Sequence, residues 1–134
     1  MGAGVARQIK EKLLTSEEFL KYRKICAEYG SNLLGTVQIL SATNGKLIAN
    51  LFGEDVPTGK DLDTSYLSLG QSLWELKKLA EKYGMSIAIP GYIGCGLAGG
   101  DWNIVSKIIY EIFEESTVIV ELCFLPENKG GMKR

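Results

Sequence analysis

Apolar residues recur every three or four positions near the start of the chain, which is the spacing of helices that bury one face. Residues 4–14 predict one such helix, whose apolar face consists of Val5, Ile9 and Leu13. A second helix is predicted directly afterwards, because Thr15 and Glu18 form a capping box and Gly30 provides a stop. Its apolar stripe consists of Phe19, Tyr22, Ile25, Cys26 and Tyr29.

Two more helices are predicted in the second half of the chain. One covers residues 65–83 and stops at Gly84, with a buried stripe of Leu69, Leu73, Leu76 and Leu79. The other covers residues 101–115, with Asp101 as its N-cap rather than as a general base. The apolar stripe of this last helix consists of Val105, Ile108, Ile109, Ile112 and Phe113.

Four further runs are typical of strands. Residues 36–42 and 46–52 are rich in β-formers and flank the Asn-Gly dipeptide at 44–45, which favours a tight hairpin. Residues 85–90 are continuously apolar, which suits a strand buried on both faces, and residues 117–125 form the last strand. The order helix, helix, hairpin, helix, strand, helix, strand predicts an α/β fold with a mixed sheet and helices on both faces.

Composition fits one domain. The 134 residues, 46% hydrophobic and 23% charged, suit a single domain over residues 1–125, and the basic segment 126–134 is predicted to be a disordered tail. A net charge of −1 argues against duplex nucleic acid as a partner, because a long phosphate backbone calls for a basic domain. No apolar run reaches membrane-spanning length and no signal-peptide pattern is present, so we expect a cytoplasmic protein without membrane contact.

The chain contains no histidine and three cysteines, which narrows its chemistry. Without imidazole there is no Ser-His or Cys-His nucleophile, no imidazole general base and no His-bound metal. No metal site and no cofactor are expected. Cys26 and Cys123 lie in apolar patterns and are predicted to be core thiols. Cys95 lies in a glycine-rich loop, where a small residue is a simpler interpretation than a reactive thiolate.

The most distinctive segment covers residues 90–102, Pro-Gly-Tyr-Ile-Gly-Cys-Gly-Leu-Ala-Gly-Gly-Asp-Trp, and joins an apolar strand to a helix through five glycines. A loop so poor in side chains lets backbone N–H groups approach a ligand, and the following helix directs its positive end into the same space. A diphosphate is therefore the expected ligand. A second glycine-rich turn, at residues 1–6, also runs into a helix, and together the two turns predict two sides of one anion cleft.

Both segments resemble the ligand loops of macro domains, with Met-Gly-Ala-Gly-Val-Ala at 1–6 as the first loop and residues 90–102 as the second. The similarity extends to about residue 125, and it is greatest to small bacterial and phage macro proteins and to the terminal ADP-ribose protein glycohydrolase of animals. The resemblance implies a three-layer α/β/α fold. It also implies an ADP-ribose site at the carboxyl ends of the strands.

The resemblance further implies which residues would line the ligand. The first loop would lie along the distal ribose and diphosphate, the second would wrap the diphosphate through backbone amides, and the last strand would border the adenine. The residues so implied are Gly2, Ala3, Gly4, Val5 and Ala6, then Tyr92, Ile93, Gly94, Cys95, Gly96, Leu97 and Ala98, and finally Phe124 and Leu125. Tyr92 either covers a ribose or packs, and Trp102 is interpreted as a core anchor.

The chain departs from the family pattern in two ways. The edge strand, short helix and central strand that precede the first loop in macro domains, roughly 30 residues, have no counterpart, so the chain looks N-terminally truncated. Either it is truncated or its start is mis-assigned, or the remaining strands close the gap, or a second chain completes the sheet in an oligomer; truncation with weakened ADP-ribose binding is the hypothesis preferred. The catalytic lysine and aspartate of the glycohydrolase fall on Asp63 and Ala98, so lysine-aspartate chemistry is not expected there.

Two functional hypotheses follow. As an enzyme, the chain would hydrolyse ADP-ribose 1″-phosphate or an ADP-ribosyl adduct by positioning and by backbone stabilisation of phosphate charge. Asp63 is then the catalytic candidate that orients water, although a solvated aspartate or helix cap is the simpler interpretation. Alternatively, the chain is a non-catalytic module that binds ADP-ribose or an ADP-ribosylated substrate, or an inactive phage-derived remnant.

Overall fold

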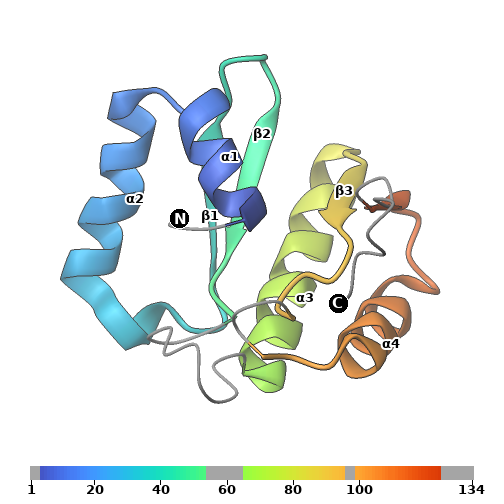
Figure 1. Ribbon diagram of the computed structural model, residues 1–134. Helices are drawn as coiled ribbons and strands as arrows, with labels where there is room; N and C mark the ends of the chain where they lie inside the picture. The colour runs from blue at the N-terminus through green and yellow to red at the C-terminus, as the bar shows by residue number, and fades with distance from the viewer. Residues whose placement is uncertain (1–3, 54–64, 96–98, 125–134) are drawn as a thin grey trace, which may run out of the picture.

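The computed structural model describes residues 4–53, 65–95 and 99–124 (Figure 1). In chain order its elements are α1 (Gly4–Lys12), α2 (Ser16–Tyr29), the 3-10 helix η1 (Gly30–Leu33), β1 (Val37–Ser41), β2 (Leu47–Leu51), α3 (Tyr66–Tyr83), β3 (Ile87–Pro90), α4 (Trp102–Phe113) and β4 (Val120–Cys123). Each predicted helix and strand is present, usually a few residues shorter than expected. The predicted tail, residues 126–134, lies outside the described residues.

The described strands form two separate pairs. β1 and β2 are antiparallel, with Val37 opposite Leu51, whereas β3 and β4 are parallel, with Pro90 opposite Cys123. The α/β class with strands of mixed direction is confirmed. Instead of one continuous sheet, however, the described residues form two two-stranded sheets, because the hairpin closes locally and β3 reaches β4 only through the α4 crossover.

The hairpin turn follows from its Asn-Gly dipeptide. The amide of Ala42 donates to the carbonyl of Lys46 at 2.8 Å, and Gly45 adopts a φ of +83°. A positive φ is strained for most L-residues but costs glycine little, so Gly45 lets the chain reverse between the strands. The predicted hairpin is confirmed.

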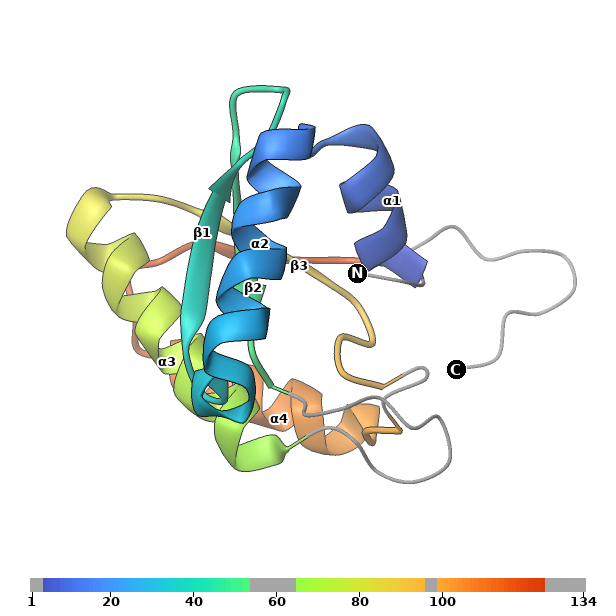
Figure 2. The same ribbon diagram turned by 90° about the vertical axis from the view of Figure 1, so that its left-hand side faces the viewer.

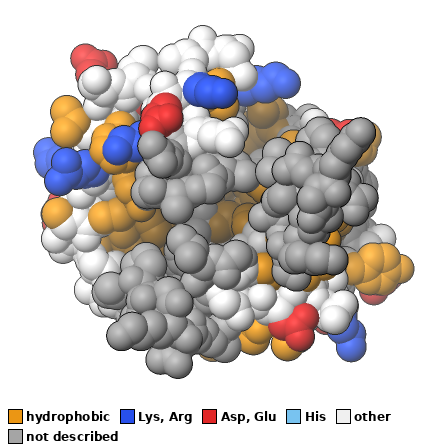
Figure 3. Space-filling model, in the orientation of Figure 1, with side chains coloured by type: hydrophobic (Ala, Val, Ile, Leu, Met, Phe, Trp, Pro, Cys, Tyr) orange, Lys and Arg blue, Asp and Glu red, His pale blue; other side chains and the backbone are white. Residues whose placement is uncertain are grey.

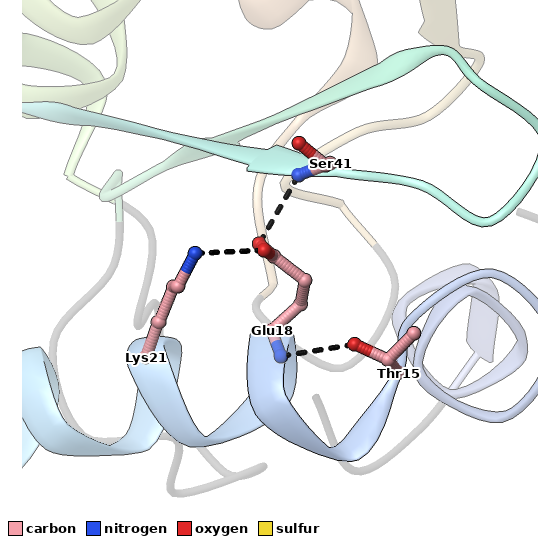
Figure 4. Close-up of polar contacts among 4 residues, drawn as sticks. All are labelled: Thr15, Glu18, Lys21 and Ser41. Atoms are coloured by element: carbon pink, nitrogen blue, oxygen red, sulfur yellow. Dashed lines mark hydrogen bonds and ion pairs between the residues drawn. The ribbon is translucent and has the colours of Figure 1, made fainter.

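A carboxylate links α2 to the edge of β1 (Figure 4). Thr15 caps α2, since its Oγ1 accepts from the Glu18 amide at 3.2 Å. The Glu18 carboxylate accepts from Lys21 Nζ at 2.8 Å and from the Ser41 amide at 3.2 Å. The ammonium of Lys21 and the amide of Ser41 hold the pKa of Glu18 below its ordinary value. The predicted capping box is therefore only half present: Thr15 caps the helix, but the Glu18 carboxylate accepts from a backbone donor of β1 instead of the Thr15 amide.

Helices lie on both sides of the hairpin, with α1 and α2 on one side and α3, β3 and α4 on the other (Figure 1). The apolar core lies among α3, β3 and α4 and is formed by Leu69, Leu73, Ile89, Val105, Ile109 and Phe113. The stripe predicted for α4 is confirmed, because all five of its residues are buried or half-buried. The core thus supports the β3 end from which the glycine-rich loop emerges.

The stripe predicted for α3 is only partly correct. Leu69 and Leu73 are buried and Leu76 is half-buried, but Leu79 is 37% exposed. The buried face continues through Ala80 instead, which lies seven residues after Leu73 and two helical turns further along the same face. The predicted helical spacing of the buried residues was right, but the last buried residue is Ala80 and not Leu79.

Three expectations about burial are wrong. On β3, Ile89 is buried but Ala88 is exposed, so this strand is not covered on both faces by the described residues. Cys123 is exposed and Cys26 only half-buried, so neither thiol lies in the core. Alternate side chains of a strand point to opposite faces, and only one face of the β3–β4 pair packs against α3 and α4.

Candidate functional site

The parallel pairing of β3 and β4 brings two predicted site segments together. Both strands point in the same direction, so the loop after Pro90 and the residue after Cys123 leave the same end of the pair. The Gly91 amide donates to the Cys123 carbonyl at 2.7 Å and extends the ladder by one step. In open α/β sheets the carboxyl ends of parallel strands are the usual place for a ligand.

Three aromatic rings cluster at this end, and we call Tyr92, Trp102 and Phe124 the aromatic cluster. The ring centroids of Tyr92 lie 5.3 Å from Trp102 and 5.4 Å from Phe124, and Trp102 lies 5.9 Å from Phe124. Phe124 remains 50% exposed, whereas Trp102 also packs against the core. The core-anchor interpretation of Trp102 is confirmed. The Tyr92 ring packs against Trp102 and Phe124, which agrees with the packing alternative for this residue, and its contact with a ribose stays a prediction.

Gly91 is required by packing. A Cβ at this position would collide with the ring of Phe124. The sequence did show a glycine directly after an apolar strand. The spacing of residues could not show that this glycine packs against Phe124, 33 positions later. The close approach holds the Phe124 ring against the first residue of the loop.

The loop folds largely through bonds among its own backbone groups. The amides of Ile93 and Cys95 donate to the carbonyls of Pro90 and Tyr92 at 3.3 and 2.9 Å. The Gly99 amide donates to Cys95 at 2.8 Å. Two of the amides expected to wrap a diphosphate, those of Ile93 and Cys95, therefore serve the fold of the loop in this structure.

Left-handed backbone explains part of the glycine content of the loop. Gly94 and Gly99 have φ values of +76° and +80°, and Tyr92 adopts +63°, which is uncommon for a residue with a side chain. The Gly100 amide donates to the Gly94 carbonyl at 3.0 Å, so the two ends of the loop are joined. Glycine at 94 and 99 is thus needed for conformation, whatever ligand the loop meets.

The loop ends at the N-cap of α4. Asp101 Oδ1 accepts from the Asn103 amide at 2.9 Å, which confirms the predicted cap. The Asp101 amide donates to the hydroxyl of Tyr66 at 3.0 Å, a contact between residues 35 positions apart. Sequence reasoning missed Tyr66, because nothing local indicates that the start of α3 meets the start of α4.

Cys95 is a poor nucleophile in this setting. Burial, and to a lesser extent the negative charge of Asp101, raise the pKa of its thiol. Its sulfur lies 3.5 Å from the Ile93 carbonyl, to which the thiol donates. A protonated, half-buried thiol agrees with the interpretation of Cys95 as a small loop residue.

The first glycine-rich segment is described only in part. Gly4, Val5 and Ala6 form the first turn of α1, and Figures 1 and 2 place this end of α1 on the same side of the molecule as the loop after β3. In Figure 3, which has the orientation of Figure 1, hydrophobic side chains show near the middle of this face. The predicted site residues that lie outside the described parts are Gly2, Ala3, Asp63, Gly96, Leu97, Ala98 and Leu125.

A separate groove of about 430 Å³ lies on the α3 and α4 side of the molecule. Its lining includes Tyr66, Trp74 and Ile108 but none of the residues predicted to bind ligand. Among residues 4–53, 65–95 and 99–124, no group of three or more Cys, Asp and Glu side chains is arranged to hold a metal ion. No helix within the same ranges has the length and apolar character needed to cross a bilayer.

Comparison with known families agrees with the resemblance of the two loops. The sequence model for the macro domain matches residues 1–109 of this chain. The chain belongs to the macro domain family. This macro domain is 31% identical over 118 residues to the ADP-ribose glycohydrolase OARD1 of Bos taurus, covering 88% of this chain and 70% of the relative.

Solved structures share the macro domain fold. A protein of unknown function from Bacteroides thetaiotaomicron superimposes with a TM-score of 0.79 at 28% identity, covering 92% of this chain and 79% of that one. The macrodomain of Mycobacterium tuberculosis DarG gives a TM-score of 0.75 at 23% identity, covering 95% and 82%. The two separate strand pairs of this chain are therefore compatible with the arrangement of elements in a macro domain.

Proposed function

We propose that this macro domain binds ADP-ribose, or the ADP-ribosyl group of a modified substrate, at the carboxyl ends of β3 and β4. The observation that carries the proposal is the convergence of the glycine-rich loop, Phe124 and the N-terminus of α4 at one end of a parallel strand pair. The similarity to a relative named as an ADP-ribose glycohydrolase supports ADP-ribose as the ligand.

Different segments of the site are proposed to bind the diphosphate, the adenine and the distal ribose of the ligand. The diphosphate lies against the loop formed by residues 92–98 and the positive end of α4, since backbone dipoles there favour an anion. The exposed face of Phe124, with Leu125 beside it in sequence, borders the adenine. Residues 2–6 lie along the distal ribose and the diphosphate. The amides of Ile93 and Cys95 bond within the loop, so they would reach the diphosphate only by exchanging these bonds for bonds to phosphate oxygens.

Calorimetric titration of the full chain with ADP-ribose, ADP and adenosine tests the proposal. We expect saturable ADP-ribose binding and a ligand-dependent rise in Tm, because a ligand that binds only the folded state stabilises it. Phe124→Ala removes the proposed adenine contact and raises the Kd of ADP-ribose roughly tenfold. Ile119→Ala, at a 75% exposed position at the opposite end of β4, is the matched control and leaves the Kd unchanged. Absence of heat and of any Tm shift at millimolar ADP-ribose rules the function out.

Hydrolysis is a second candidate, favoured by the activity in the name of the 31% identical relative. The substrates to test are ADP-ribose 1″-phosphate and an ADP-ribosylated peptide, and Asp63 is the candidate that orients water. Phosphate or ADP-ribose release by the wild type, lost in Asp63→Ala with ADP-ribose affinity retained, supports an enzyme. Binding without turnover of either substrate supports a non-catalytic module, and neither binding nor turnover supports an inactive remnant.

We also propose that a second copy of the chain adds to one of the two small sheets. β2 and β3 belong to different two-stranded sheets, and no strand of the described residues joins them. A second copy of the chain is proposed to pair with one of these strand edges, because unpaired backbone N–H and C=O groups at an edge are ready to accept another strand.

A further inference from the structure

We propose that Tyr66 is a positioning residue for the diphosphate loop, acting through the backbone of Asp101. Its hydroxyl accepts the Asp101 amide at 3.0 Å, at the point where the loop ends and α4 begins. The role of the loop is itself proposed above, so the inference rests on that function. It extends the site to a residue outside both glycine-rich segments.

Tyr66 is held in place from its own side. It is the first residue of α3, and the preceding Ser65 donates its amide to the Gly53 carbonyl at 2.7 Å. Ser65 Oγ caps the helix by accepting from the Ser68 amide at 3.1 Å. The Tyr66 side chain also packs against the core cluster. The hydroxyl is therefore a fixed acceptor on the α3 side of the site.

Asp101 transmits this position to the loop and to α4. Its carboxylate accepts from the Asn103 amide, and its carbonyl accepts from the amides of Ile104 and Val105 at 3.0 Å each. The neighbouring Gly100 amide closes the loop onto the Gly94 carbonyl at 3.0 Å. A shift of the Asp101 backbone thus changes both the first turn of α4 and the closure of the loop.

The bond between the Tyr66 hydroxyl and the Asp101 amide is better explained by ligand binding than by the stability of the fold. Asp101 is exposed, so water can accept its amide proton when the hydroxyl is removed, and the fold loses little. Ligand binding is more demanding, because amides must meet the phosphate oxygens at hydrogen-bonding distance. Removing the hydroxyl is therefore expected to affect diphosphate recognition more than unfolding.

The test compares Tyr66→Phe with Tyr110→Phe in the full chain. Tyr66→Phe keeps the ring in the core and deletes only the hydroxyl, whereas Tyr110 is a 66% exposed tyrosine on α4 and serves as the matched control. We expect Tyr66→Phe to raise the Kd of ADP-ribose roughly fivefold to tenfold and to leave adenosine binding unchanged, because adenosine has no diphosphate. Amide hydrogen exchange at Asp101 becomes faster, and Tm changes by less than about 2 °C.

The outcomes separate this inference from the function on which it rests. If the wild type binds ADP-ribose and Tyr66→Phe stays within about twofold of it, the positioning role is wrong and the function stands. If Tyr66→Phe weakens ADP-ribose and adenosine equally while Tm falls, Tyr66 is structural, which also overturns the inference. If the wild type binds no ADP-ribose, both proposals fail together.

Discussion

Single side chains in the candidate site take their chemistry from their surroundings. Cys95 lies in a loop that offered room for a nucleophile, yet burial and the nearby Asp101 carboxylate raise its thiol pKa. Cys123, by contrast, is exposed after a strand pattern that predicted burial. Cys123, predicted to be a core thiol, is therefore more accessible than Cys95.

We expect iodoacetamide to alkylate Cys123 faster than Cys95 near neutral pH. The reactive species is the thiolate, and a raised pKa together with partial burial lowers the thiolate fraction and the access at Cys95. Peptide mapping by mass spectrometry measures each site, with Cys95→Ser as the control for assignment. Alkylation of Cys95 should accelerate as the pH rises through and beyond the ordinary thiol value of 9.0. Faster labelling of Cys95 than of Cys123 at pH 7 would contradict the assignment.

A second residue-scale prediction concerns Glu18. Lys21 and the Ser41 amide lower its pKa in the folded chain, so its contribution to stability is complete above the ordinary value of 4.5 and is lost as the pH falls through the lower folded value. Glu18→Gln should therefore lower Tm at pH 7 and make no difference once the pH is well below 4.5. Glu17→Gln, on the same first turn of α2, is the control. A Tm difference that is constant across this pH range argues against the two bonds.

At the scale of elements, the β3–β4 pair contacts the glycine-rich loop where the Phe124 ring packs against Gly91. The Phe124 ring occupies the space that a Cβ at Gly91 would need, and the Gly91 amide bonds to Cys123. Because β3 contains four residues, Ile87–Pro90, a displaced contact at its end affects a large part of its pairing. The element and the loop therefore respond together to a change at Gly91.

Gly91→Ala is expected to destabilise the chain by about 1–3 kcal/mol, because the new methyl group displaces the Phe124 ring. Phe124→Ala removes the obstacle, so in that background Gly91→Ala should cost much less. Urea unfolding of the two single variants and the double variant measures this coupling as a double-mutant cycle. Additive costs would show that the two residues do not compete for the same space.

At the scale of the whole molecule, two small sheets share the helices packed around them. α3 contacts both strands of the hairpin and also forms the core with α4 and β3. An isolated two-stranded sheet is marginal in water, so each pair depends on this helical packing. The edges of these two pairs are where the proposed second copy would bind.

We expect light scattering coupled to gel filtration to show a mass that rises with concentration from 14.7 kDa towards twice that value. The reason is that edge strands pair with strands of another chain. Replacing the exposed Ala88 with proline should prevent the rise if β3 provides the edge, since proline cannot donate to a ladder. Proline at Ser16, the first residue of α2, where this residue is tolerated, is the control. A constant mass of 14.7 kDa at all concentrations excludes the dimer.

The sequence by itself determined the features that depend on neighbours within a few residues. The caps at Thr15 and Asp101, the left-handed stop at Gly84 and the hairpin at Asn44-Gly45 are all as predicted. The apolar period of α4 also identified its buried face correctly. These features were readable because hydrogen bonds and side-chain repeats within one helical turn or one hairpin are set by local order.

Tertiary structure alone decided which distant residues meet. The Tyr66–Asp101 bond, the Phe124 ring over Gly91, the separation of the two strand pairs and the exposure of Cys123 each depend on how whole elements pack. The glycine-rich loop could be located from its amino-acid sequence, but the contacts of Tyr66 and Phe124 that hold it could not. Contacts between residues more than 30 positions apart follow from the packing of helices on strands, and no local pattern encodes that geometry.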